Sequence, residues 1–166
     1  ELEGIIQTQV NPQIGLDFSR LLRTFLRQDP DIIMLGEIRD EESALMALRA
    51  AQTGHLVLST LHTNDAISAI SRLQQLGIQS HEIENSLLLV IAQRLVRKRC
   101  LKCSQEFGDS CDCHQGYQGR IGVYQFLQCE NNRYQTDFDS LYQSALEKVK
   151  DNITDLDEIQ RVLGKK

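Results

Sequence analysis

Two short apolar runs constrain the fold of this chain more than any other feature. The runs "DIIML" at residues 31–35 and "HLVLSTL" at residues 55–61 are rich in branched side chains, and each stops at polar residues. Continuous apolar runs of this length are typical of strands covered on both faces, as in a parallel sheet. Acidic residues at 40–42 and a glycine at Gly54 predict a helix between the runs, because acids favour a helix N-terminus and glycine often ends a helix.

The sequence before the first run predicts a strand and a helix. Residues 3–10 alternate well enough between polar and apolar for a strand. Apolar residues then recur at the spacing of one helix face, namely Phe18, Leu21, Leu22, Phe25 and Leu26. Asp17 or Ser19 can cap the start of this helix.

The sequence after the second run predicts two more helices, at about residues 65–77 and 81–97. The second of these is too apolar for a surface helix and would need to be covered on several sides. Alternating strands and helices are the pattern of an α/β fold with a parallel sheet and crossover connections.

The C-terminal third has a different composition. Past residue 99, Cys, Gly and polar residues follow without a period up to about Gly122, and "VYQFLQ" then predicts a short strand. Cys129 after this strand is expected to be a small buried residue. An amphipathic helix is predicted from Phe138, Leu141, Tyr142, Ala145, Leu146 and Val149. A shorter helix follows, with Thr154 as its candidate cap.

Polar residues suited to phosphate, Mg²⁺ and proton chemistry follow both apolar runs. In open parallel sheets, ligands bind beyond the carboxyl ends of the strands. A carboxylate such as Glu37 can there hold Mg²⁺ through water or orient an attacking water. His62 offers donors for a γ-phosphate, together with its neighbours Thr60, Thr63 and Asn64. Either residue alone is better explained as structural, but two at equivalent strand ends favour a nucleotide site.

Four of the 5 cysteines lie close together in the sequence, at Cys100, Cys103, Cys111 and Cys113. In a cytosolic chain, such crowding indicates a metal site. Cys100 and Cys103 form half of a zinc site, because two intervening residues let both sulfurs reach one tetrahedral ion. Cys111 with either Cys113 or His114 supplies the second half. The alternative is a degenerate site of free thiols.

Composition excludes several other classes of protein. A hydrophobic content of 41% in 166 residues is enough for the core of one domain. No run approaches the roughly 18 apolar residues of a membrane span, so we expect a cytoplasmic chain without membrane insertion. The net charge of −5 disfavours direct binding of nucleic acid. We interpret the local basic cluster as a solvated helix end; it consists of Arg94, Arg97, Lys98, Arg99 and Lys102.

Several segments resemble the ATPases that power type II secretion and type IV pilus assembly. "LRQDPDIIMLGEIRD" is similar to the Walker B segment of that family, and "TGHLVLSTLHTNDA" is similar to its histidine box. The segments "QTQVNPQIGLDFSRLLR", "IAQRLVRKRC" and "GYQGRIGVY" extend the resemblance over about residues 4–127. The resemblance implies a RecA-like parallel sheet in a homo-hexameric motor, which uses ATP with Mg²⁺ to move an inner-membrane platform protein. It also implies a cytoplasmic location that is peripheral to the inner membrane.

The resemblance assigns roles to particular residues. Glu37 matches the Walker B glutamate, and His55 and His62 match the two histidines of the box. Arg23, Arg27 and Arg39 match basic residues that link the nucleotide state to a neighbouring subunit or domain. The cysteines favour the assembly or secretion branch over the retraction motors, which lack a tetracysteine insert.

The phosphate-binding pattern G-x-x-x-x-G-K-[ST] occurs nowhere in the sequence. The chain therefore resembles the C-terminal portion of a larger enzyme, without the P-loop half, and is expected to be inactive alone. Residues 1–98 would be the C-terminal portion of the RecA-like domain, 99–123 a small Cys-rich zinc subdomain, and 124–166 a short strand with C-terminal helices.

Two other functions compete with the motor. One is a zinc-stabilised docking module that binds the platform protein without turnover. The other is a zinc-ribbon nucleic-acid binder, which the acidic balance and the absence of interleaved aromatic residues disfavour.

Overall fold

The computed structural model describes residues 3–105, 111–130, 133–135 and 138–164. The chain divides into two compact units, one of residues 1–62 with 71–86 and one of residues 63–70 with 87–166. Each unit has its own hydrophobic core.

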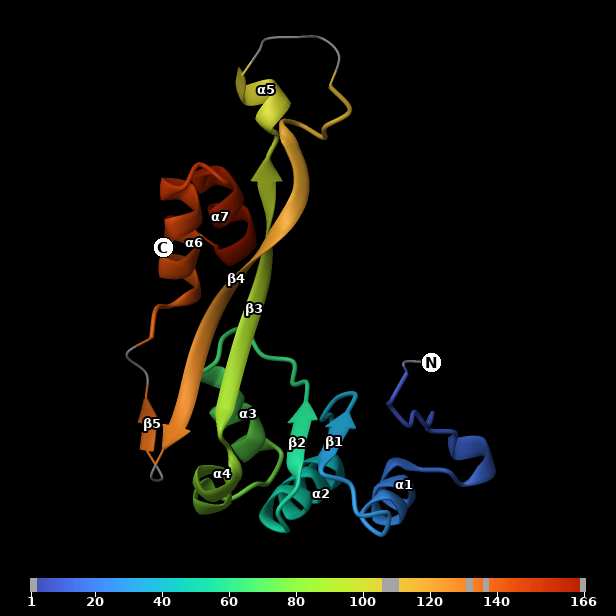
Figure 1. Cartoon of the computed structure of the whole chain (residues 1–166). Helices are drawn as coiled ribbons and strands as arrows, with labels where there is room; N and C mark the ends of the chain where they lie inside the picture. Colours follow the sequence, from blue (N-terminus) through green and yellow to red (C-terminus); the bar gives the residue numbers. More distant parts are fainter. Residues whose placement is uncertain (1–2, 106–110, 131–132, 136–137, 165–166) are drawn as a thin grey trace. The chain divides into compact units, whose positions relative to one another are not determined.

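Figure 1 labels the elements of both units. The first unit contains η1 (Pro12–Ile14), α1 (Phe18–Phe25), β1 (Ile32–Leu35), α2 (Glu41–Gln52), β2 (Leu56–Ser59) and α4 (Ser80–Ser86). Helix α3 (Ser68–Gln75) contributes residues to both units. The second unit contains β3 (Leu89–Arg99), α5 (Leu101–Gln105), β4 (Tyr117–Glu130), β5 (Arg133–Gln135), α6 (Leu141–Lys150) and α7 (Leu156–Leu163).

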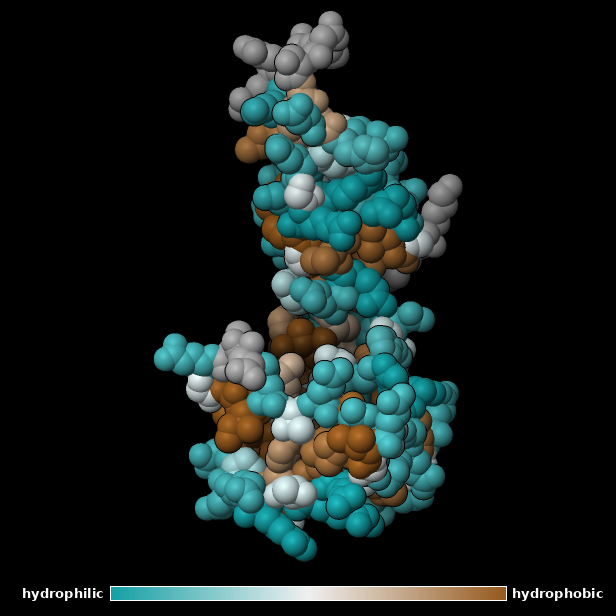
Figure 2. Space-filling model, turned by 90° about the vertical axis from the view of Figure 1, so that its right-hand side faces the viewer, coloured by the Kyte–Doolittle hydropathy of each residue, from teal (hydrophilic) through white to brown (hydrophobic). Residues whose placement is uncertain are grey.

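Strands β1 and β2 pair in parallel, so the predicted parallel sheet and the crossover helix between its strands are confirmed. The core lies on one face of this pair, where Ile33 and Leu35 pack against α1 and α2. The prediction that both faces are covered is wrong for the described residues, because Ile32 is 59% and Met34 is 74% exposed. Large apolar side chains also reach the surface elsewhere in both units, as the brown areas of Figure 2 illustrate.

Local capping chemistry fixes the helices of the first unit. The Asp17 side chain accepts a hydrogen bond from the Arg20 N–H at the start of α1. Asp40 and Ser43 form a capping box at the start of α2, which satisfies N–H groups that have no partner within the helix. The chain leaves α2 through Gly54 at φ +101°, a conformation that disfavours other residues. The sequence predicted Asp17 as one of two candidate caps, the start of α2 at residues 40–42 and its end at Gly54, but not the capping box with Ser43.

The strand predicted at residues 3–10 is wrong. Residues 3 and 4 form a turn, residues 5–10 have no regular structure, and Ile6 is 91% exposed. An alternating pattern becomes a strand only where a neighbouring strand accepts and donates its backbone hydrogen bonds. None of the described residues pairs with residues 5–10.

The helix predicted at residues 81–97 is correct only as far as Ser86. Helix α4 ends at Ser86, and the apolar run continues as β3, which pairs antiparallel with β4. Buried residues alternate with exposed ones along β3, with Ala92 and Val96 on the covered face. The apolar content of this run is also typical of a buried helix. Its branched residues favour a strand, and β4 supplies the backbone hydrogen bonds that a strand needs.

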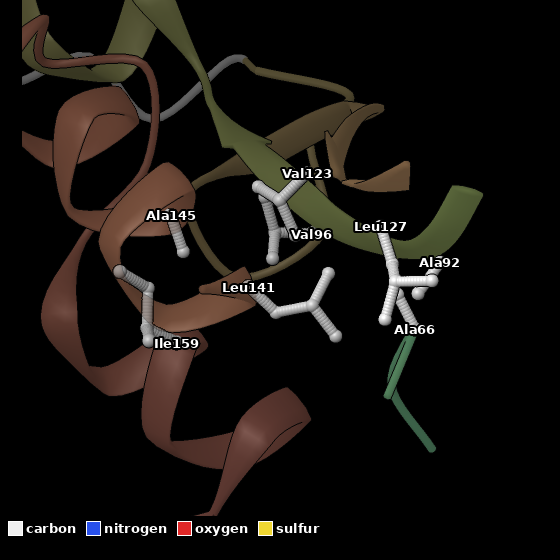
Figure 3. Packing of buried hydrophobic residues seen from close by; sticks show 8 residues of the cluster. All are labelled: Ala66, Ala92, Val96, Val123, Leu127, Leu141, Ala145 and Ile159. Atoms are coloured by element: carbon white, nitrogen blue, oxygen red, sulfur yellow. The ribbon is translucent and has the colours of Figure 1, made fainter. Parts of the chain in front are cut away.

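The long ribbon of β3 and β4 carries the core of the second unit. Strand β4 begins at Tyr117, earlier than the predicted strand, and β5 pairs with its C-terminal end. Helices α6 and α7 pack on one side of the ribbon (Figure 1). Figure 3 shows the buried side chains of this core, namely Ala66, Ala92, Val96, Val123, Leu127, Leu141, Ala145 and Ile159. Cys129 is buried as predicted.

The last helix begins differently from its prediction. Asp155, not Thr154, caps α7 by accepting a hydrogen bond from the Glu158 N–H. The Thr154 hydroxyl instead donates to the Arg97 carbonyl oxygen at 2.8 Å. Thr154 therefore fastens the start of α7 to β3.

A buried ion pair joins α7 to β3. The Glu158 carboxylate is fully buried and accepts from Arg97 Nε at 2.8 Å and from Arg161 Nε at 2.7 Å. It also accepts from the Arg97 backbone N–H at 2.8 Å. The hydrogen bonds from Arg161, followed by those from Arg97, outweigh burial and lower the pKa of Glu158 to about 2.

We expect acid to remove the stabilisation from this ion pair. Because the pKa of Glu158 is lowered from 4.5 to about 2 on folding, its contribution is complete above pH 4.5 and is lost as the pH falls toward 2. The shift corresponds to about 3 kcal/mol of unfolding free energy. Urea unfolding between pH 6 and pH 2 measures it, with Glu158→Gln as the control that should be less stable at pH 6 and less dependent on pH. A variant with the same pH dependence as the wild type would contradict this role.

Candidate functional site

The ends of β1 and β2 bring Glu37 and His62 together. His62 Nε2 lies 3.2 Å from Glu37 Oε2, although 25 residues separate the two in sequence. The parallel register causes this contact, because both side chains follow the carboxyl ends of neighbouring strands. The sequence-based expectation that the two residues lie at equivalent strand ends is confirmed.

Backbone and hydroxyl contacts hold the two strand ends in place. The Ile38 N–H donates to the Thr60 carbonyl oxygen at 2.9 Å, and the Thr60 hydroxyl donates to the Gly36 carbonyl oxygen at 2.7 Å. These bonds extend the pairing of the strands past their ends. Thr60, which the sequence suggested as a phosphate donor, uses its hydroxyl proton on the protein itself.

Arg39 completes the group around Glu37. Its guanidinium forms an ion pair with the carboxylate, whose side chain is 29% exposed. The hydrogen bond from Arg39, with a smaller contribution from His62, lowers the pKa of Glu37. Glu37 is therefore ionised at neutral pH, which is the state that holds a metal-bound water or accepts a proton.

The other predicted site residues lie elsewhere. His55 lies at the opposite end of β2, where its Nδ1 is 2.9 Å from the Ala50 carbonyl oxygen and 3.1 Å from the Thr53 hydroxyl. Arg23 and Arg27 are exposed on and just after α1. No contact among the described residues brings these three side chains to Glu37.

The structure also shows a contact that the sequence did not indicate. Arg94 on β3 donates to the carbonyl oxygens of Thr63 at 3.2 Å and Asn64 at 2.9 Å. Local sequence patterns cannot reveal a contact across 30 residues. Arg94 thus holds the backbone that directly follows His62.

A second candidate site lies at the tip of the β3–β4 ribbon, beside α5 (Figure 1). The sulfur atoms of Cys100, Cys103, Cys111 and Cys113 all lie within 4.8 Å of one another. Cys100 is 3.4 Å from Cys111, and Cys103 is 3.2 Å from Cys113. Zn–S bonds of about 2.3 Å in a tetrahedron place sulfurs about 3.8 Å apart, so the four thiols fit one zinc ion.

The ribbon ends hold the cysteines in this arrangement. The Cys100 N–H donates to the Gly116 carbonyl oxygen at 2.7 Å, and His114 forms a backbone bridge with Tyr117. The Cys103 N–H also donates to the Cys100 sulfur and lowers the pKa of that thiol to about 7, which favours the thiolate that binds metal. The group of close ligand atoms includes Cys113 and does not include His114.

None of the helices in the described ranges is both long and apolar enough to cross a membrane.

The sequence is similar to that of known transport and pilus proteins. The family described as "Type II/IV secretion system protein" matches residues 1–161. A protein transport protein HofB homolog from Haemophilus influenzae is 79% identical over 99% of this chain and 36% of its own length. The type IV pilus assembly ATPase PilB of Acinetobacter baylyi is 42% identical over 97% of this chain and 35% of its own length. The chain thus spans about a third of the length of these relatives.

Solved structures share the fold. The Legionella pneumophila ATPase DotB matches 90% of this chain and 43% of its own, with a TM-score of 0.71 and 22% identity. The pilus retraction motor PilT with bound ADP matches 89% of this chain and 45% of its own, with a TM-score of 0.67 and 30% identity.

Proposed function

The chain belongs to the family of type II/IV secretion system proteins, and we propose that it forms part of a motor ATPase for type IV pilus assembly or type II protein secretion. The contact of Glu37 with His62 at the carboxyl ends of two parallel strands is the observation that carries this proposal. Relatives named as ATPases of pilus assembly and of type II secretion support it.

Glu37 and His62 would divide the chemistry of ATP hydrolysis. The ionised Glu37 would orient the attacking water or help to hold Mg²⁺ through a water, and that ion would supply charge neutralisation at the phosphates. His62, whose side chain is 88% exposed, is free to turn from Glu37 toward a γ-phosphate. Arg39 would report the nucleotide state, since its ion pair with Glu37 must change when Glu37 engages the substrate.

The proposed site also needs a phosphate-binding loop, which the 166 residues do not contain. We therefore propose that the 166-residue chain alone does not hydrolyse ATP. In the full-length protein, the parallel pair of strands would belong to a RecA-like sheet. We further propose, from the resemblance of the sequence motifs, that the full-length protein is a homo-hexamer that acts on an inner-membrane platform protein from the cytoplasmic side.

The four cysteines would hold a structural zinc ion. Bound there, zinc would link Cys100 and Cys103 at the end of β3 and on α5 to Cys111 and Cys113 before β4. The ion would give this segment its order and leave no open coordination position for catalysis.

The two histidines of the box should respond differently to mutation in the full-length protein. We expect His62→Ala to lower ATP turnover on the order of 10²-fold without lowering the melting temperature, because it removes a donor to developing charge from an exposed position. His55→Ala should lower the melting temperature, because it removes the contacts of the His55 ring with the Ala50 carbonyl oxygen and the Thr53 hydroxyl in the turn between α2 and β2. Steady-state turnover and thermal unfolding measure the two effects. His81→Ala, an exposed histidine of α4, should change neither; normal turnover of His62→Ala would contradict the proposed site.

A further inference from the structure

The second unit contains an open groove of about 550 Å³ that the ATPase proposal does not use. Strand β3 supplies Leu95 and Arg97, and β4 supplies Arg120. Helix α7 supplies Arg161 and Val162. The lining thus combines three guanidinium groups with two apolar side chains and includes no acidic residue.

The Glu158 carboxylate, which binds two of the lining arginines, has its acceptor positions filled. Glu158 Oε1 accepts from the Arg97 N–H at 2.8 Å and from Arg161 Nη2 at 2.7 Å. Glu158 Oε2 accepts from Arg97 Nε at 2.8 Å and from Arg161 Nε at 2.7 Å. A carboxylate offers about four lone-pair sites, so Glu158 has none left for a third arginine.

Arg120 therefore lacks a partner in this group. It lies directly opposite Arg97 in the antiparallel register of β3 and β4. Like charges at opposite positions destabilise a strand pair unless a counter-charge lies between them. Another acid near the start of α7, Asp155, accepts from the Tyr117 hydroxyl and from the Glu158 N–H. Among the described residues, Arg120 has no hydrogen bond to a carboxylate.

Arg97 and Arg161 are held in place by Glu158 and still have unused N–H donors. Arg97 and Arg161 each use their Nε and Nη2 groups on Glu158, which leaves the Nη1 donors of both. Arg97 also lies 4.0 Å from the centre of the Tyr117 ring, which fixes the plane of its guanidinium. Preformed arginine donors of this kind suit the oxygens of a phosphate.

We propose that this groove binds the phosphate group of an organic anion. Three guanidinium groups and one carboxylate leave a net charge of +2, which a phosphate dianion neutralises. The volume of about 550 Å³ exceeds that of one phosphate, and Leu95 and Val162 offer apolar surface to the group that carries it. None of the residues assigned to ATP hydrolysis lines the groove, so this binding is a separate activity of the second unit.

Titration of the 166-residue chain with inorganic phosphate at constant ionic strength tests the proposal. We expect saturable binding by calorimetry and shifts of the side-chain N–H signals of Arg97, Arg120 and Arg161 by NMR. Arg120→Gln should weaken phosphate binding by about tenfold, because it removes a charge-assisted hydrogen bond. Arg133→Gln is the matched control, since it removes the same charge from an exposed position on β5, and should change affinity less than about twofold.

The outcomes distinguish specific binding of phosphate in the groove from non-specific attraction of anions to positive charge. Equal weakening by Arg120→Gln and Arg133→Gln would overturn the proposal, and so would shifts spread over arginines outside the groove. The NMR shifts are recorded on the wild-type protein, so they decide the question even if Arg120→Gln unfolds.

Two further probes identify the source of the phosphate. Glycerol phosphate represents a soluble organic phosphate, and vesicles of phosphatidylglycerol represent a lipid headgroup, with phosphatidylcholine vesicles as the neutral control. Binding of one probe alone, weakened about tenfold by Arg120→Gln, assigns the groove to that source. Failure of both probes to bind would overturn the proposal, whereas it would leave ATP hydrolysis at Glu37 unaffected.

Discussion

Glu37→Gln is expected to lower ATP turnover of the full-length protein by roughly 10²–10³-fold, with MgATP still bound. The amide keeps the shape of the side chain. It removes the negative charge that would orient the attacking water and attract Mg²⁺. The hydrogen bond from Arg39 already lowers the pKa of Glu37, so its carboxylate is ionised across the neutral range. Turnover measured at saturating ATP, together with binding of a fluorescent nucleotide, separates the loss of chemistry from the loss of binding.

A nearby acid provides the matched control for this variant. Glu41 is exposed in the first turn of α2, and Glu41→Gln makes the same chemical change without touching Arg39 or His62. It should leave turnover within about twofold of the wild type, as is usual for surface changes. If Glu37→Gln behaved in the same way, Glu37 would be a structural residue of the strand end and the proposed site would be wrong.

The sequence was sufficient where local chemistry decides the structure. The capping residues Asp17 and Asp40 and the turn at Gly54 determine where helices begin and end. Two apolar runs joined by one helix could form a parallel pair, and that topology alone placed Glu37 beside His62. The central part of the candidate site was therefore predictable from residues 31–62.

The sequence was insufficient where a distant partner decides the structure. Residues 89–99 form a strand because β4 pairs with them, whereas residues 3–10 remain irregular without a partner among the described residues. The contacts of Glu158 with Arg97 join positions 61 residues apart. Apolar content alone does not distinguish a buried helix from a strand, so such errors fall on segments whose neighbours come later in the chain.

Removal of zinc is expected to destabilise the second unit strongly, most of all at the tip of the β3–β4 ribbon. Structural zinc contributes on the order of 10 kcal/mol or more of apparent binding free energy in small peptides. The tip of the ribbon has little else to stabilise it, because Cys103 is exposed and Leu101 is 72% exposed. We expect one zinc per chain in protein purified without a chelator. Chelation should lower the melting temperature and abolish amide-exchange protection at Cys100, whose N–H donates to Gly116.

Mutation of single ligands identifies the fourth one. Cys113 lies 3.2 Å from Cys103 within the sulfur cluster, whereas His114 is engaged through its backbone with Tyr117. Cys113→Ser should therefore reduce the zinc content well below one per chain, and His114→Ala, the matched control one residue away, should retain it. Elemental analysis and thiol titration of both variants measure the difference. Zinc loss in His114→Ala alone would assign the fourth position to the histidine. Four freely titrating thiols in the native wild type would instead show that the cysteines hold no metal, because zinc-bound thiolates resist such reagents.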